Sequence, residues 1–168
     1  ETSNGIKIGV INALGRVFMS PIDSQWEIVK KEIERIKEIT PIVIIDFHAE
    51  ATAEKVCFGR FCADLGVSAF FGTHTHIQTA DEKVLNKMGY ITDAGFCGSV
   101  EGVIGMDYGS SLSRFNSIVA ERYEIAGGDV SQVNAVEVEI TPSTGEAVAI
   151  KRIFCIIDKK EKEVENEM

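Results

Sequence analysis

The sequence predicts a single α/β domain in which strands and helices alternate along the chain. Two apolar runs, residues 42–47 and 67–71, have the nearly continuous composition that is typical of strands buried on both faces of a sheet. Segments with helical periodicity stand before and between them. Because the chain has 168 residues, about the size of one domain, this alternation favours one layered α/β core.

The first strand and the first helix come from the amino-terminal part of the chain. Residues 6–11 have strand composition and one apolar face. The helix begins after Ser24, which we expect to form a capping box with Glu27, and it ends before Pro41. Its apolar stripe consists of Trp26, Val29, Ile33 and Ile36.

Later segments continue the sheet and then change character. We expect helices at 50–65 and 111–115, and strands at 90–93, 119–125, 133–140 and 147–157. The last two strands flank a turn at Pro142–Gly145 and predict an antiparallel hairpin. Five glycines between residues 95 and 109 match neither a P-loop nor a dinucleotide fingerprint, so we expect a tight loop beside the substrate. The charged tail, 158–168, is expected to fray.

Composition excludes several classes of function. The net charge of −9 would repel a polyanion, so we do not expect a partner such as duplex nucleic acid. No apolar run reaches the roughly 18 residues that a membrane helix needs. The cysteines form no C-x-x-C pair, and we expect reduced core thiols in a cytoplasmic protein. They are Cys57, Cys62, Cys97 and Cys155.

All three histidines of the chain follow predicted strands. His48 ends one strand, and His74 and His76 come directly after the next. Ligands of open α/β sheets bind at this carboxyl edge. In extended backbone, residues two apart point the same way, so His74 and His76 could reach one metal ion or two adjacent ones. Asp46 has the same spacing to His48 and could be a ligand or an acceptor that orients it.

Other polar residues near these histidines are candidates for supporting the ligands or positioning a substrate. The alternative for each is helix capping or loop hydrogen bonding. These candidates are Asp46, Glu50, Thr75, Gln78, Asp93 and Asp107.

Four motifs, in order, resemble those of the YmdB-like family of metallophosphoesterases. They are DFHAEATAEK at 46–55, GTHTHIQTAD at 72–81, YITDAG at 90–95 and GVIGMD at 102–107. The family is similar to calcineurin-like phosphoesterases, which have a layered α/β sandwich and a dinuclear metal centre. The resemblance implies that His48, His74 and His76 are metal ligands. It also implies two divalent ions (Mn, Fe or Zn) and a cyclic nucleotide or other phosphodiester as substrate, with a 2′,3′- or 3′,5′-cyclic phosphate.

The chain departs from the family pattern at its amino-terminal side. There the family has an aspartate, a bridging glutamate, an asparagine and a catalytic histidine in a G-N-H segment, and this sequence contains no such motifs. Residues 1–157 therefore resemble the carboxyl-terminal part of the family domain, and we expect a sandwich that is incomplete at the amino-terminal side. The chain is then a fragment, is completed by another chain or by the missing segment, or has lost activity.

Three functions are compatible with these residues and motifs. The leading hypothesis is a metal-dependent phosphodiesterase whose histidine half lies in this chain, with no catalytic residue assigned. A non-catalytic module that binds metal or dimerises through an exposed sheet edge is the second. A mononuclear zinc hydrolase built from Asp46 and the three histidines is the third.

Overall fold

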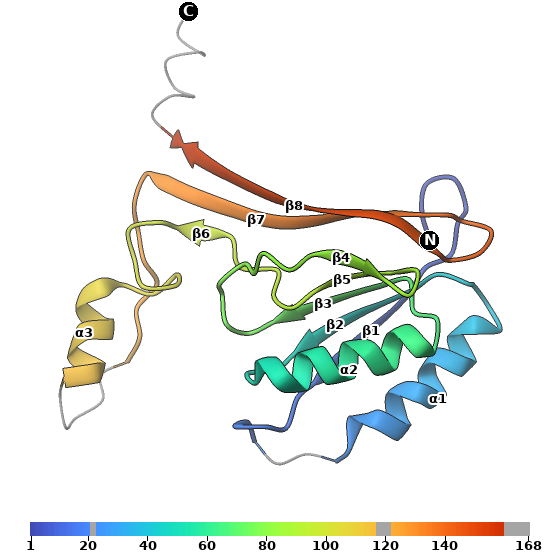
Figure 1. Ribbon diagram of the computed structural model, residues 1–168. Coiled ribbons are helices and arrows are strands. Elements are labelled where there is room, and N and C mark those ends of the chain that lie inside the picture. Colours follow the sequence, from blue (N-terminus) through green and yellow to red (C-terminus); the bar gives the residue numbers. More distant parts are fainter. Residues whose placement is uncertain (21–22, 117–121, 160–168) are drawn as a thin grey trace, which may run out of the picture.

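The computed structural model describes residues 1–20, 23–116 and 122–159 and confirms the layered α/β fold. A five-stranded sheet has the order β1-β2-β3-β5-β4. Its parallel strands are β1 (Gly9–Leu14), β2 (Val43–His48), β3 (Ala69–Thr73) and β5 (Met88–Ile91), and β4 (Lys83–Leu85) pairs antiparallel with β5. Helices α1 (Gln25–Lys37) and α2 (Thr52–Asp64) cover one face of this sheet (Figure 1).

A second sheet lies over the other face of β4 and β5 (Figure 1). It consists of β6 (Gly98–Ser99), β7 (Val130–Ile140) and β8 (Ala147–Asp158), all antiparallel. The long β7–β8 hairpin confirms the predicted antiparallel end of the chain. The predicted tail overlaps this strand at Asp158, and residues 160–168 lie outside the described part.

Apolar side chains between the helices and the first sheet form the core. Rings of adjacent aromatic residues lie 4.5 to 6.3 Å apart, from centroid to centroid. These residues are Trp26, Phe47, Phe58, Phe61, Phe70 and Tyr90. The stripe predicted for α1 faces this cluster, with Val29, Ile33 and Ile36 buried. Burial of these side chains fixes the helices on the sheet and so fixes the connections between its strands.

The start of the chain differs from its prediction in two ways. The strand runs from Gly9 to Leu14 rather than from 6 to 11, because it pairs with β2 over those six residues. At Gly9, a Cβ atom would come within 2.2 Å of Ile36, so α1 crosses the strand where there is no side chain. Ser24 precedes α1 in extended conformation, but its side chain makes no capping hydrogen bond. Instead, the Gln25 amide donates to Glu54 of α2 at 3.3 Å.

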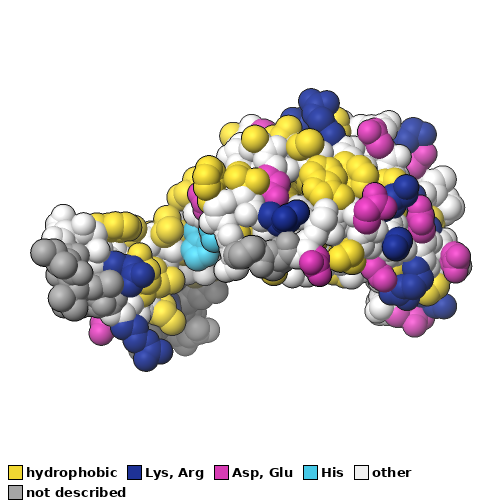
Figure 2. All heavy atoms as spheres, turned by 90° about the horizontal axis from the view of Figure 1, so that it is seen from below, with side chains coloured by type: hydrophobic (Ala, Val, Ile, Leu, Met, Phe, Trp, Pro, Cys, Tyr) yellow, Lys and Arg dark blue, Asp and Glu magenta, His cyan; other side chains and the backbone are white. Residues whose placement is uncertain are grey.

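Between β6 and β7 the chain forms an arm that extends from the body (Figure 1). It carries α3 (Tyr108–Asn116), which confirms the short helix predicted at 111–115. The strand predicted at 119–125 is wrong for residues 122–125, and residues 119–121 lie outside the described part. Ile125 makes only an isolated bridge with Met106 and is 84% exposed, because no neighbouring strand covers it. Figure 2 shows apolar side chains gathered on this arm.

The cysteine prediction is correct for one residue. All four thiols are free, but only Cys62, on the buried face of α2, is shielded from solvent, and the other three are exposed. Burial raises the pKa of the Cys62 thiol to about 12, because the thiolate would lose its hydration. None of the helices in the described residues has the length and apolar composition needed to cross a lipid bilayer.

The contrast between Ile33 and Ile28 on α1 tests the core. Ile33 is 1% exposed and Ile28 is 55% exposed. We expect Ile33→Ala to lower the free energy of unfolding by about 2–5 kcal/mol through lost burial and a cavity. Ile28→Ala should change it by less than about 1 kcal/mol. Urea denaturation measures both, and equal losses would contradict the assignment of this helix face.

Thiol accessibility tests the positions of the cysteines. With a colorimetric disulfide reagent at pH 8, we expect Cys57, Cys97 and Cys155 to react in the native chain, since they are exposed. Cys62 should react only after denaturant is added, because it is buried and its pKa is raised. Four rapid equivalents without denaturant would contradict the burial of Cys62 on the inner face of α2.

Candidate metal centre

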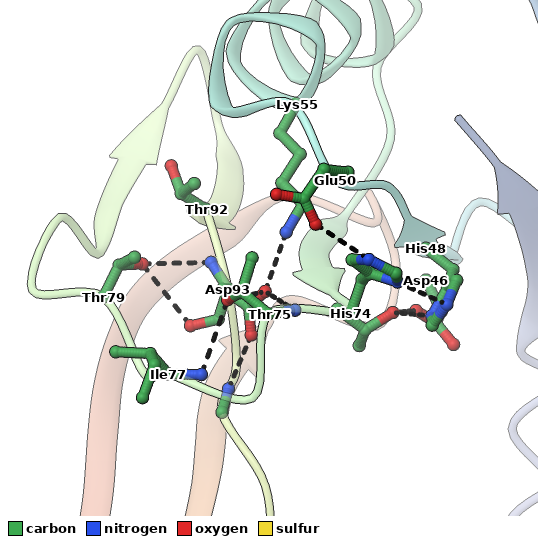
Figure 3. Close-up of polar contacts among 12 residues, drawn as sticks. Asp46, His48, Glu50, Lys55, His74, Thr75, Ile77, Thr79, Thr92 and Asp93 are labelled. Atoms are coloured by element: carbon green, nitrogen blue, oxygen red, sulfur yellow. Dashed lines mark hydrogen bonds and ion pairs between the residues drawn. The ribbon is translucent and has the colours of Figure 1, made fainter. Parts of the chain in front are cut away.

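The carboxyl edge of the five-stranded sheet gathers the polar residues that follow β2, β3 and β5. His48 is the last residue of β2, His74 follows β3 and Asp93 lies two residues beyond β5. The parallel register pairs His48 with Thr73 across β2 and β3. Side chains from three segments of the sequence therefore lie together, as Figure 3 shows.

Two histidines form the centre of this site. Nε2 of His48 lies 3.0 Å from Nδ1 of His74, and the two rings are nearly perpendicular. Two nitrogens bound to one tetrahedral ion at ordinary Zn–N distances would be roughly 3.3 Å apart. The pair is therefore spaced so that both nitrogens could face a single cation.

A chain of hydrogen bonds fixes which nitrogen of His48 faces His74. The Thr73 hydroxyl donates to Oδ1 of Asp46 at 2.8 Å, so its oxygen is left to accept from Nδ1–H of His48 at 3.2 Å. Asn12 donates to the other Asp46 oxygen at 2.8 Å. Nε2 of His48 consequently keeps its lone pair, directed at His74. Burial and the adjacent His74 lower the pKa of His48, which favours this neutral ring.

Glu50 has the corresponding position next to His74. Its Oε2 atom lies 2.8 Å from Nε2 of His74, where it accepts that proton. In the neutral ring, Nδ1 of His74 is then the nitrogen with the lone pair. Two lone pairs 3.0 Å apart repel each other unless a proton or a metal cation lies between them. The two rings together thus form an electron-rich pair that is suited to a shared cation.

His76 does not join this pair. Its Nδ1 donates to the carbonyl of Ile104 at 2.8 Å, and its ring stacks on Phe96. The prediction that His74 and His76 point the same way rests on extended backbone, and it is wrong here. Both residues have positive φ, 106° for His74 and 63° for His76, so the chain turns at each of them. Among the described residues, no three His, Cys, Asp or Glu side chains are grouped so that they could hold one metal ion.

Asp93 anchors residues 74–79, the histidine loop, to the segment that follows β5. The residue is fully buried and forms an ion pair of 2.7 Å with Lys55 of α2, which is also buried. It also accepts from the backbone and the hydroxyl of Thr75. Lys55 was not among the residues predicted from the sequence, although its spacing with Phe58 and Cys62 on the buried stripe of α2 was a signal.

Two other residues predicted to support the site, Asp107 and Gln78, make hydrogen bonds that hold the backbone of the fold. Asp107 accepts from the amide of Ser110 at 2.8 Å and so holds the first turn of α3. The Gln78 amide donates to three carbonyls, those of Ala94, Ala135 and Ile153. It connects the histidine loop to the β7–β8 hairpin.

The glycine-rich loop reaches the site through His76. Ile104 and Phe96 both contact this histidine. A cavity of about 370 Å³ opens beside it, with Gln132, Asn134 and Phe154 in its wall. The glycine-rich loop therefore contacts His76, but its described residues make no hydrogen bond or ring contact with the His48–His74 pair.

The fold and this site define a class: an α/β sandwich with a histidine and carboxylate cluster at the carboxyl edge of its parallel strands. The model of the YmdB-like protein family matches residues 1–153, and the chain belongs to this family. The chain is 40% identical over 153 residues to the 2′,3′-cyclic-nucleotide 2′-phosphodiesterase of Bacillus subtilis, a match that covers 90% of the chain and 57% of that protein.

Solved structures agree with the fold. A hypothetical protein from Thermus thermophilus superposes with a TM-score of 0.80 at 30% identity, over 88% of this chain and 56% of that one. A novel phosphatase from Mycoplasma pneumoniae gives a TM-score of 0.79 at 30% identity, over 92% and 55%. The chain thus spans little more than half the length of these relatives.

Replacement of Lys55 tests the buried ion pair. Lys55→Met keeps an unbranched side chain that is only one atom shorter, but it removes the ammonium group and leaves Asp93 buried without its partner. We expect a loss of about 3–5 kcal/mol in the free energy of unfolding. The control is Lys87→Met, which removes an exposed ion pair with Glu146 and should cost no more than about 1 kcal/mol. Similar losses in chemical denaturation would contradict the burial of the Lys55–Asp93 pair.

Proposed function

We propose that the chain provides the histidine half of a dinuclear metal centre in a hydrolase that cleaves cyclic-nucleotide phosphodiesters. The observation that carries the proposal is the pair of facing nitrogens in His48 and His74, each with its other N–H held by an acceptor. Histidines that bind metals in proteins almost always donate their other ring N–H to an oxygen acceptor, as His48 does to the Thr73 hydroxyl and His74 to Glu50. The name of the Bacillus subtilis relative supports a 2′,3′-cyclic nucleotide as substrate.

The donor set fits one edge of such a centre. His48 and His74 would bind one ion, and imidazole together with oxygen ligands suits Mn, Fe or Zn. His76 would join them only after giving up its hydrogen bond to Ile104. The remaining ligands would come from outside this chain, as its coverage of 55–57% of its relatives allows. When bound, two ions lower the pKa of a water and stabilise the charge that develops on the phosphoryl group.

The residues of this chain would act mainly by orientation. Asp46, through Thr73, and Glu50 fix the tautomers of His48 and His74, so the ligand nitrogens need no rearrangement. The cavity beside His76 could take the nucleoside part of a substrate, with Phe154 and the Asn134 amide in its wall. The metal ions, rather than basic side chains, would then attract the phosphate to a protein of net charge −9.

A non-catalytic module that binds metal or dimerises is the second candidate. It is favoured by the lack of any group of three metal-ligating side chains in the described residues. Strand β1 also lies at an edge of the sheet, where Val10 is 67% exposed. The mononuclear zinc hydrolase has less support, because Asp46 and His76 are directed to Asn12 and Ile104 instead of to a common point.

Metal stoichiometry and turnover test the proposal together. After equilibration with Mn²⁺, elemental analysis should give bound metal in the wild-type chain, and His48→Ala and His74→Ala should lose most of it. Hydrolysis of 2′,3′-cyclic AMP is assayed with the segment or partner chain that supplies the remaining ligands, and it should be at least about 100-fold slower with either variant than with the unchanged sequence, since ligands are removed. Ile28→Ala is the control for folding.

The outcomes separate the candidates. Bound metal that raises the melting temperature, with no turnover even when the remaining ligands are supplied, would favour the non-catalytic module. Full metal content and turnover in His48→Ala would overturn the assignment of the site.

A further inference from the structure

The segment that carries His74 and His76 has an unfavourable backbone. Both histidines have φ in the left-handed region, which residues with a Cβ rarely adopt. Such conformations persist only where the surroundings impose them, and they are concentrated at functional sites. Contacts to Thr75, the residue between the two histidines, are therefore needed to keep the backbone in this conformation.

Asp93 makes the contacts that hold this residue. Its Oδ2 atom accepts the backbone N–H of Thr75 at 3.1 Å and the Thr75 hydroxyl at 2.7 Å. Oδ1 accepts the backbone N–H of Gly95 at 2.9 Å. The Thr75 hydroxyl in turn lies 3.4 Å from the N–H of Ile77. One carboxylate thus connects the histidine loop to the segment that follows β5 (Figure 3).

The backbone of Asp93 holds the far end of the same loop. Its carbonyl accepts the N–H of Thr79 at 3.1 Å, and its N–H donates to the Thr79 hydroxyl at 3.0 Å. The loop between His74 and Thr79 is therefore attached to one residue at two points. Neither contact involves the ring of a histidine.

The charge of Asp93 is balanced from the opposite side. Lys55 reaches it from α2, and both side chains are about 1% exposed. A buried ion pair is weak evidence for stability, because desolvating two charges costs about as much as their attraction returns. A buried acid that accepts four hydrogen bonds and holds a strained loop fits better with precise placement of that loop.

We propose that Asp93, with Lys55 as its counter-charge, is a positioning residue that holds His74 in ligand geometry through Thr75. The inference rests on the proposed function, since it assigns Asp93 to the support of that metal site. In this role, Asp93 would contact neither the ion nor the substrate, because its carboxylate is occupied by Lys55, Thr75 and Gly95. Its effect passes from the carboxylate to the Thr75 hydroxyl and N–H, and from there to the backbone of His74.

Thr75→Val is the sharpest variant for a test. It removes the hydroxyl but keeps the shape of the side chain, and it leaves the Lys55–Asp93 pair in place, so the chain should still fold. Thr75→Ser restores the hydroxyl and is the rescue variant. Thr40→Val is the matched control, since Thr40 is also a mostly buried threonine, and its hydroxyl donates to Lys7 at 2.8 Å.

Two measurements on the full chain report on metal binding and on the His74 ring, and not on the stability of the fold. The first is titration with Co²⁺, followed by its visible absorption. The second is the ¹⁵N chemical shifts of the His74 ring without added metal, which report its tautomer. We expect Thr75→Val to weaken Co²⁺ binding about 10- to 100-fold and to shift the His74 ring signals. Thr75→Ser and Thr40→Val should keep the affinity within about threefold of wild type and leave the ring signals unshifted.

Each result bears on the proposal. Wild-type affinity and unshifted His74 signals in Thr75→Val would overturn it, and so would an equal loss in Thr40→Val. If wild type binds no Co²⁺ but Thr75→Val still shifts His74, the metal function fails and the positioning role stands. If wild type binds Co²⁺ and Thr75→Val changes neither readout, the metal function stands and the positioning role fails.

Discussion

The parallel register between β2 and β3 is the constraint on which the site depends. It places His48 directly opposite Thr73, with His74 as the next residue along the chain. A shift of one residue would turn every side chain of the strand to the other face of the sheet and separate the two rings. That register is held by burial, because Val43, Ile45 and Phe47 alternate into the core on the same strand. Strand β2 therefore packs into the hydrophobic core with one face and carries His48 on the other.

Much of the fold could be predicted from local patterns. The buried strands are nearly continuous apolar runs, the apolar stripe of α1 has a helical period, and the β7–β8 hairpin has a turn between its two strand-like runs. Where prediction failed, the cause was a contact distant in sequence. The bounds of β1 depend on its pairing with β2, and in place of the predicted capping box, Gln25 at the start of α1 donates to Glu54 of α2. The short strand β4 was missed, although the left-handed Asn86 and Lys87 between it and β5 are typical of a tight hairpin turn.

In the site, too, local patterns predicted some features, and contacts distant in sequence determined the others. Strand ends alone place His48 and His74 at one edge, and the structure brings their rings together. The orientation of His76 could not be predicted from the H-x-H spacing, because the extended backbone assumed for it is replaced by two left-handed residues. Lys55 was hidden for a different reason. A lysine on a helix is ordinarily assigned to the solvent, and although Lys55 has the spacing of the buried stripe of α2, the counter-charge that permits its burial, Asp93, comes 38 residues later.

The three hydrogen bonds of Gln78 have a chemical consequence for the ageing of this protein. Its Nε2 atom lies 3.1 to 3.4 Å from the carbonyl oxygens of Ala94, Ala135 and Ile153, so only a donor suits this place. Deamidation would convert the side chain to glutamate, which has almost the same shape but no N–H. An anion would then face three carbonyl oxygens and separate the histidine loop from the hairpin. The loss of one amide group would thus release the loop that carries His74 from the hairpin that packs beside it.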